Sequence, residues 1–365
     1  MSDTFGLLNS AGLDASDDSS GKLHKPLQQH SRKQLLYAVL LTGVCVGFVA
    51  SQHLYLHHQR WEERVPTRQL QQIAPRSELE AILQQIAPNH EVMIAISNYN
   101  LIREGMLTSW LEMVVKAQVP NYLVVAIDPQ LRDDLTAKGY NVYYRDITIE
   151  ASQQGTGDNH AISALKFKIL QEFLELNWHV LLSDVDIVTL QNPFDFLYRD
   201  HDVEGMSDGF DDWTAYGKVG GLDDPKMGWA RYAQSTEHLN LNSGLFYLRA
   251  NERTLGLMQR IAARLSKEKA WDQSVYNQEI FFLSHDDYIA PHVTVRVMNI
   301  YKFMNSKVLF KEVRHKPRSQ QVSPVMVHIN YHPDKHERMK AVIQYYVDGD
   351  DHALERFPGG SEPGS

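Results

Sequence analysis

Short apolar runs alternate with helix-compatible stretches along the middle of the chain. β-branched and other apolar residues fill 91–97 and 122–127, each followed by a stretch that suits a helix, and a third short strand is expected at 141–144. This alternation is typical of βαβ units, which build a parallel sheet. The pattern therefore predicts an α/β fold.

A further apolar run is followed by paired acids. Residues 179–183 are mostly apolar, Asp184 and Asp186 come next, and the chain turns at Asn192 and Pro193. A short apolar run bounded by turn residues is expected for a buried strand covered on both faces. A core-facing helix is expected before it, because apolar residues recur there at helical spacing: Ile162, Leu165, Ile169, Leu170, Phe173 and Leu174. Further strands are expected at 203–207, 241–248, 294–298 and 325–329, and helices at 252–268, 273–284 and 334–347.

The pattern changes near the amino terminus. Residues 34–59 contain no Lys, Arg, Asp or Glu, and residues 35–50 are almost continuously apolar. This core is slightly shorter than the roughly 17 to 25 residues of a membrane-spanning helix, which suits a thin bilayer. Basic residues are more numerous before the run than after it, which favours a cytosolic amino terminus. A cleaved signal peptide is the alternative, although the polar leader is long for one.

These observations predict five segments along the chain. We expect a disordered cytosolic tail at 1–33, a transmembrane signal-anchor at 34–52, a stem at 53–88, one α/β domain at 89–355 and a disordered carboxyl terminus at 356–365. The polar tail and the final Pro, Gly and Ser residues lack the apolar periodicity that a packed core requires.

The composition narrows the choice of chemistry. With 365 residues, of which 43% are hydrophobic, the chain can build a substantial core. The net charge is −9 and the basic residues are dispersed, so nucleic-acid binding is not expected. Sugar-nucleotide or metabolite chemistry fits better. Cys45, the only cysteine, lies in the expected span, so the rest of the chain can form no disulfide.

The two acids after the run at 179–183 predict a metal site. Ligands in open α/β sheets bind beyond the carboxyl ends of the strands, where Asp184 and Asp186 are expected to lie. A pair of carboxylates there can hold a hard divalent cation, and such a cation neutralises a nucleotide diphosphate. The alternative is that both acids are solvated turn residues or helix caps.

Three groups of polar residues farther along the chain stand at the edges of apolar elements. They are Asn242, Ser243 and Gly244; Asp272 and Gln273; and His328, His332 and Lys335. The first group can bind hydroxyls and admit close backbone approach, or it can be a turn or bulge. The second can bind a substrate or only begin a helix. In the third, a histidine can complete a metal shell and the ammonium can meet a phosphate, or the group can be a surface turn.

A set of sequence blocks joins these segments to a known family. The blocks are Leu165-Lys-Phe-Lys-Ile-Leu, Val180-Leu-Leu-Ser-Asp-Val-Asp-Ile-Val, Leu190-Gln-Asn-Pro-Phe, Gly205-Met-Ser-Asp-Gly, Met227-Gly-Trp-Ala-Arg-Tyr-Ala, Phe303-Met-Asn-Ser-Lys-Val-Leu-Phe-Lys and His328-Ile-Asn-Tyr-His-Pro-Asp-Lys. Through them the chain from about Glu91 to Gly349 resembles the RRA-type arabinosyltransferases of plants and green algae, in glycosyltransferase family 77 of the nucleotide-diphospho-sugar transferase superfamily.

The resemblance implies a fold, an activity and a location. It implies a GT-A domain, Rossmann-like, in a type II Golgi membrane protein whose catalytic domain is lumenal. The implied reaction, dependent on Mn²⁺ or Mg²⁺, transfers L-arabinofuranose from UDP-L-arabinofuranose to hydroxyproline-linked arabinosides of extensin-type, hydroxyproline-rich glycoproteins. Retention of the anomeric configuration is also implied, and complexes with other Golgi arabinosyltransferases are a further expectation.

The resemblance also implies roles for individual residues. Metal binding falls to Asp186 and His328, with Asp184 on the ribose or metal side of the nucleotide. Lys335 would face the diphosphate, Lys166 would approach the donor from the helix before the paired acids, and Ser97 is a further candidate for donor binding. The sugar and acceptor pocket would be lined by Asn242, Asp272 and Gln273, of which Asp272 and Gln273 are the candidates to face the anomeric carbon.

Other functions share parts of this pattern. A phosphohydrolase can use one Asp of an Asp-x-Asp motif as nucleophile, but that motif normally opens its domain, whereas three expected strands precede Asp184 here. A transferase using UDP-galactose or UDP-xylose is a second alternative. A non-catalytic sugar-nucleotide-binding scaffold is the third, and the complete set of Asp184, Asp186, Asp272 and His328 argues against it.

Overall fold

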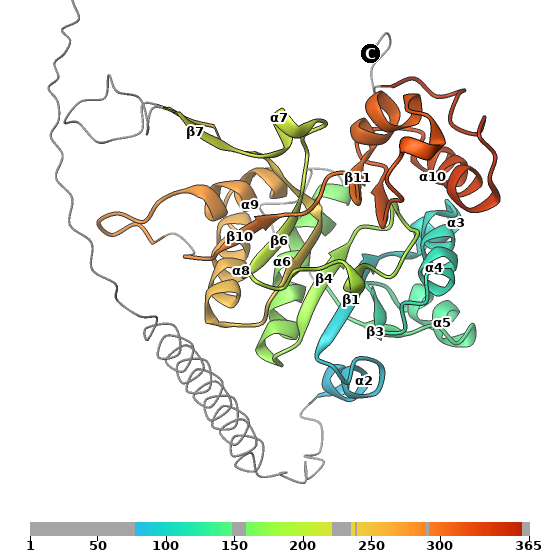
Figure 1. The fold of residues 1–365 in the computed structure, drawn as a ribbon. Helices are drawn as coiled ribbons and strands as arrows, with labels where there is room; N and C mark the ends of the chain where they lie inside the picture. Colours follow the sequence, from blue (N-terminus) through green and yellow to red (C-terminus); the bar gives the residue numbers. More distant parts are fainter. Residues whose placement is uncertain (1–76, 148–157, 221–234, 238, 290–291, 360–365) are drawn as a thin grey trace, which may run out of the picture. The chain divides into compact units, whose positions relative to one another are not determined.

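The computed structural model describes residues 77–147, 158–220, 235–237, 239–289 and 292–359 (Figure 1). The expected cytosolic tail and membrane span lie outside these ranges. Within the described ranges, no helix combines the length and the apolar character needed to cross a membrane.

Seven strands form a mixed sheet at the centre of the fold (Figure 1). In spatial order they are β10 (Val295–Val297), β6 (Val203–Ser207), β9 (Leu241–Leu248), β4 (His179–Ser183), β1 (Glu91–Ser97), β2 (Tyr122–Ala126) and β3 (Val142–Tyr144). Every neighbouring pair is parallel except those of β9, which runs antiparallel to both β4 and β6. The α/β class is confirmed, whereas the expectation of a parallel sheet is wrong at β9. This strand is buried along its whole length, so its apolar sequence does not reveal its direction.

Alternate residues of the strands face two different cores. In β1, Val92 and Ile94 belong to the first core, and Met93 and Ala95 to the second. Both sets are apolar because helices cover both faces of the sheet. Residues of α2 (Glu78–Ile86), α6 (Asp158–Glu175), α8 (Glu252–Leu265) and α9 (Asp272–Phe281) pack in the first core. Residues of α3 (Tyr99–Arg103), α4 (Met106–Lys116) and α5 (Pro129–Ala137) pack in the second.

A second, smaller sheet has three short strands and a core of its own. Its order is β11 (Phe303–Asn305), β12 (Met326–His328) and β5 (Ile187–Thr189), and α10 (Lys335–Ile343) packs in the same core. The sequence pattern did not predict β5 and β11, because three residues are too few to show a period of two. The remaining elements are α7 (Asp212–Ala215), the paired strands β7 (Lys218–Gly220) and β8 (Ser235–Glu237), the 3₁₀ helices η2 (Pro193–Asp195), η5 (Val313–His315) and η6 (Arg318–Gln320), and the π-helical segments η4 (Val308–Glu312) and η7 (Gln344–Asp348).

Two segments that were expected to lie outside the α/β domain pack against it. Helix α2 lies within the expected stem, yet its Leu79 and Leu83 are buried in the first core. Phe357 lies within the expected disordered terminus, yet it is buried, and its carbonyl accepts a hydrogen bond from Arg314 at 2.7 Å. These segments are therefore packed onto the α/β domain. Apolar residues in α2 recur at helical spacing, but this spacing does not reveal whether the helix packs onto the domain or stands apart from it.

Candidate active site

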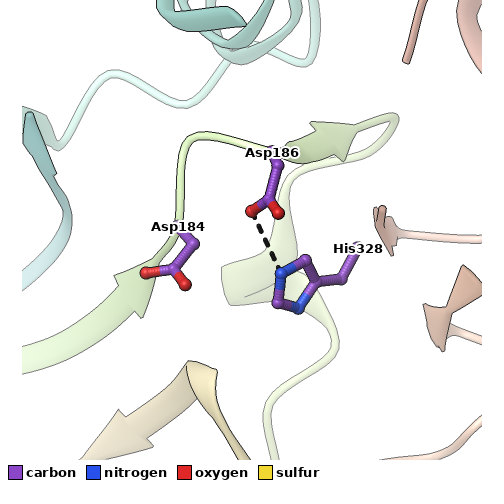
Figure 2. Close-up of side chains that lie close together, drawn as sticks. All are labelled: Asp184, Asp186 and His328. Carbon is purple, nitrogen blue, oxygen red and sulfur yellow. Dashed lines mark ion pairs between the residues drawn. The ribbon is translucent and has the colours of Figure 1, made fainter. Parts of the chain in front are cut away.

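The carboxyl edge of the main sheet brings the paired acids and a histidine together. Asp184 directly follows β4, Asp186 directly precedes β5, and His328 ends β12. Because β12 pairs antiparallel with β5, His328 lies opposite Ile187, next to Asp186. One ligand atom from each of Asp184, Asp186 and His328 lies within 4.8 Å of the others, and Figure 2 shows the three side chains converging.

Two basic groups contact Asp186. His328 Nε2 lies 3.0 Å from Asp186 Oδ1, and Lys335 Nζ lies 2.7 Å from Oδ2. Lys335 is the first residue of α10 and is partly exposed. Burial of the Asp186 carboxyl acts to raise its pKa, but His328 and Lys335 outweigh burial and hold the pKa well below its usual range. Together Asp184, Asp186, His328 and Lys335 form what we call the charged cluster.

Asp184 lacks comparable partners. Burial raises the pKa of its carboxyl, Lys166 acts against this increase, and Asp186 adds to it. A Cβ at Gly244 would lie 2.4 Å from Asp184 Oδ2, so only glycine leaves room for the carboxylate here. Asp184 is therefore a half-buried acid that gains from added positive charge.

The charged cluster fits a divalent cation. Two carboxylates and an imidazole are an oxygen and nitrogen donor set that suits Mn²⁺ or Mg²⁺. Among the described residues, His328 Nδ1 is buried and has no hydrogen-bond partner, and the raised pKa of Asp184 reflects a half-buried carboxylate short of positive charge. His332, the other histidine of this segment, is not part of the cluster. It is buried against Phe310, and burial lowers the pKa of His332 to about 4.

A buried ion pair lies beside the charged cluster. Lys166 Nζ is 2.7 Å from Asp272 Oδ2, and both side chains are about 5% exposed. Ser243 Oγ donates to the same carboxylate oxygen at 2.9 Å. Burial opposes the charged form of Lys166, but Asp272 and then Asp184 outweigh it and raise the pKa of the ammonium. The pair therefore stays ionised and holds Asp272 in one orientation at the start of α9.

Neutral amides form a second cluster around one more acid. Asn242 and Gln273 both donate to the carboxylate of Asp208, at 2.9 Å and 2.6 Å, and Asn330 donates to it at 3.2 Å. We call these four residues the amide cluster. Antiparallel β9 begins at the edge where parallel strands end, which places Asn242 there. The chain after Asn330 is strained, because Tyr331 has a φ of 67°, a conformation that costs a bulky residue about 1–3 kcal/mol.

A cleft opens at the same edge, beyond β1 and β2. It has a volume of about 740 Å³ and is lined by Asn98, Tyr99, Asn100, Arg103, Asp128, Pro129 and Gln130. Ser97, the predicted donor-binding residue, is buried at the end of β1, and its hydroxyl donates to the carbonyl of Asn98 at 3.2 Å. The side-chain oxygen of Asn98 is buried and has no hydrogen-bond partner. Ser97 therefore stays a candidate for donor binding, and the next residue, Asn98, lines the cleft with a side-chain oxygen that the other described residues leave unpaired.

The structure brings most of the predicted residues together and adds others. Asp184, Asp186, His328 and Lys335 meet in one cluster, while Lys166, Asn242, Asp272 and Gln273 meet around Ser243 and Asp208. Sequence reasoning missed Asp208, Asn330, Asn98 and Asp128. Asp208 and Asn98 directly follow buried strands, as Asp184 does, so the rule that selected Asp184 could have found them.

Comparisons with known proteins identify the relatives of this chain. The model of the family described as nucleotide-diphospho-sugar transferase matches residues 117–342. Arabinosyltransferase RRA2 of Arabidopsis thaliana is 47% identical over 285 residues, which cover 78% of this chain and 66% of RRA2, slightly less than two thirds of that protein. Arabinosyltransferase RRA1 of Arabidopsis thaliana is 43% identical over 287 residues, covering 78% of this chain and 70% of RRA1. A crystal structure of an active-site mutant of LgtC aligns with a TM-score of 0.45 at 15% identity, covering 70% of this chain and 96% of that one.

Proposed function

The chain belongs to the nucleotide-diphospho-sugar transferase family, and within it to the RRA-type arabinosyltransferases, and from this premise we propose that it transfers L-arabinofuranose from UDP-L-arabinofuranose to a hydroxyproline-linked arabinoside. The GT-A form of the α/β fold and retention of the anomeric configuration are parts of this proposal. The observation that carries it is the convergence of Asp184, Asp186 and His328 at the carboxyl edge of the sheet.

The charged cluster is suited to the diphosphate of the donor. Asp186 and His328 would hold Mn²⁺ or Mg²⁺, with Asp184 as the third ligand or as a partner of the ribose. When bound, the cation would offset the negative charge that develops on the departing UDP. Lys335 is partly exposed at the start of α10, so its ammonium can turn from Asp186 to the diphosphate. The cleft beside Asn98 and Asp128 would take the nucleoside.

The neighbouring groups are suited to the sugar. Asp272 is held by Lys166 and Ser243, and Gln273 is held by Ser243 and Asp208. Groups held in this way need no reorganisation when substrate binds, and sugar hydroxyls pair well with neutral amides and carboxylates. We assign Asp272 and Gln273 to the region of the anomeric carbon and Asn242 to the sugar pocket.

Acceptor and location form a separate part of the proposal, supported by the resemblance to RRA-type enzymes. The acceptor would be a hydroxyproline-rich glycoprotein of the extensin type, modified by this protein with other Golgi arabinosyltransferases. The chain would be a single-pass type II protein of the Golgi membrane. Protease added to intact microsomes should then remove only the amino-terminal tail, and digestion of the chain beyond His90 would contradict this orientation.

The activity can be tested directly with the purified full-length chain. UDP-L-arabinofuranose, UDP-galactose and UDP-xylose are each supplied with Mn²⁺ and an arabinosylated hydroxyproline peptide. We expect transfer from the arabinose donor, and loss of transfer when EDTA removes the cation. A clear preference for galactose or xylose would overturn the donor assignment. Binding of UDP and Mn²⁺ without turnover would instead support a non-catalytic scaffold.

A further inference from the structure

Asp208 is the common acceptor of three amides that come from separate parts of the chain. It directly follows β6, and it receives hydrogen bonds from the start of β9, the start of α9 and the turn after β12. Asn242 and Asn330 share its Oδ1, and Gln273 donates to its Oδ2. The roles proposed above for donor and metal do not involve this carboxylate.

A carboxylate fixes which way each amide points. Because it only accepts hydrogen bonds, each amide must turn its NH₂ group towards Asp208. The amide oxygens then face other donors: Asn242 Oδ1 accepts from the Gly244 N–H at 2.8 Å, Gln273 Oε1 from the Ser243 N–H at 3.2 Å, and Asn330 Oδ1 from the Ser306 N–H at 3.2 Å. The NH₂ group and the oxygen of each amide therefore both have partners. Flipping any of the three amides would place its NH₂ group against a backbone N–H, which is also a donor.

Amides already occupy most of the hydrogen-bonding positions of Asp208. A carboxylate accepts about four hydrogen bonds. The three amides take three of these positions, and Tyr331 also interacts with Asp208, an interaction that together with burial raises the pKa of the Tyr331 hydroxyl. A carboxylate so engaged is poorly placed to take a proton from an acceptor sugar.

We propose that Asp208 is a positioning residue for glycosyl transfer, which acts by fixing the amide orientation of Gln273 beside Asp272. The inference rests on the proposed function. Positive charge develops at the anomeric carbon as the leaving group departs, so an amide oxygen stabilises the transition state and an amide NH₂ opposes it. The orientation of Gln273 therefore affects turnover, while the cation and the diphosphate are bound elsewhere.

Asp208→Asn tests this role with almost no change in volume. The new NH₂ group would face the NH₂ of Gln273 across a contact that is 2.6 Å long in the native protein. Gln273 must then turn away or flip against the Ser243 N–H. We expect kcat to fall about 100-fold, the loss typical of a small misplacement at a reacting centre. The Kd of UDP measured with Mn²⁺ should stay within about twofold, because Asp208 serves the sugar end of the site.

A second variant keeps the test decisive even if Asp208→Asn folds poorly. Gln273→Glu alone places two carboxylates against each other and should reduce UDP release from the donor. Adding Asp208→Asn to Gln273→Glu restores a donor and acceptor pair at the same contact and the native net charge. The double variant should therefore turn over the donor about tenfold faster than Gln273→Glu alone, a sign reversal that independent sites do not show.

Asp195→Asn is the matched control, because Asp195 is exposed in η2 and the same chemical change there should leave kcat unaltered.

The outcomes separate the two proposals. No transfer by the wild-type chain from any UDP-sugar would end the proposed function. Transfer by the wild type with native kcat in Asp208→Asn would overturn only the role of Asp208. The role of Asp208 would also be overturned if Asp208→Asn lost as much UDP affinity as kcat. The same holds if the double variant were no faster than Gln273→Glu.

Discussion

The charged cluster and the amide cluster lie at the same edge of the sheet but are built on opposite principles. Asp186 is held by a histidine and a lysine, and Asp184 is half-buried with its pKa raised by desolvation. In the amide cluster one carboxylate is surrounded by neutral amides, and each amide hydrogen-bonds at both ends. The first arrangement would change on binding the proposed cation or diphosphate, whereas the second already has its hydrogen bonds.

The difference matches the two halves of a nucleotide-sugar donor. A diphosphate with its cation carries concentrated charge, and strong binding requires counter-charges that can move onto it, as Lys335 can. A sugar is neutral, and selectivity for it depends on fixed hydrogen-bonding groups that need no reorganisation. Ser243 connects the buried ion pair to the amide cluster, since it contacts Lys166 and Asp272 as well as Gln273.

Removing a charge from the charged cluster should have the largest effect. Asp186→Asn keeps the size of the side chain but deletes the carboxylate that contacts His328 and Lys335. We expect transfer to fall about 10²- to 10³-fold or more, together with weaker Mn²⁺ binding in a titration with UDP present. Thermal melting should show a folded protein. Wild-type transfer across the Mn²⁺ titration would show that Asp184 and Asp186 are only turn residues.

Breaking the buried ion pair should damage folding as well as turnover. Asp272→Asn leaves the ammonium of Lys166 buried without a full counter-charge, and such a loss typically destabilises a protein by about 3–5 kcal/mol. The melting temperature should drop, while UDP affinity of the folded fraction changes little. Lys166→Met combined with Asp272→Leu removes both charges, so it should recover the melting temperature without recovering transfer. An unchanged melt for Asp272→Asn would show that the pair is not structurally important.

Acid sensitivity should arise outside both clusters, at His332. Its folded pKa of about 4 lies below its ordinary 6.5, so the folded protein binds fewer protons than the unfolded chain between these values. The contribution of neutral His332 to the free energy of unfolding is therefore complete above about pH 6.5. It is lost as the pH falls towards 4, by up to about 3 kcal/mol. Between pH 8 and pH 5 the free energy of unfolding should therefore fall more in the wild type than in His332→Phe. Parallel stability curves for both proteins over this range would contradict the assignment.

The smallest effect expected is steric, at the contact between the clusters. A Cβ at Gly244 would lie 2.4 Å from Asp184 Oδ2 and 2.7 Å from His328 Cε1, so Gly244→Ala must displace the charged cluster. Overpacking of this kind costs about 1–3 kcal/mol and should weaken Mn²⁺ binding. Gly256→Ala in α8 is the control, because the added methyl group meets only the flexible end of Arg260 and should stabilise the helix by about 0.5–1 kcal/mol. Equal Mn²⁺ affinity in the Gly244 variant and the control would show that the charged cluster accommodates the added methyl group.

Sequence reasoning found the strands well where they are long and flanked by turns. The expected strands at 91–97, 203–207 and 241–248 coincide with β1, β6 and β9. It found Asp184 and Asp186 because a short continuous apolar run ends just before them. It missed Asp208, although this residue also follows a buried strand, because a single acid after a strand carries no distinctive spacing. The role of Ser97 stays a prediction, and its hydroxyl donates to the carbonyl of Asn98 in this structure.

The sequence by itself determined the α/β class, the strands of the main sheet and most of the candidate site residues, since these follow from local periodicity and from side-chain type. The tertiary structure alone decided that β9 runs antiparallel, which places Gly244 beside Asp184. It also decided that β12 pairs with β5, which places His328 against Asp186 across 142 positions of the chain (328 − 186). Strand direction and pairing are properties of two segments together, and each buried strand has the same apolar pattern whichever neighbour it meets.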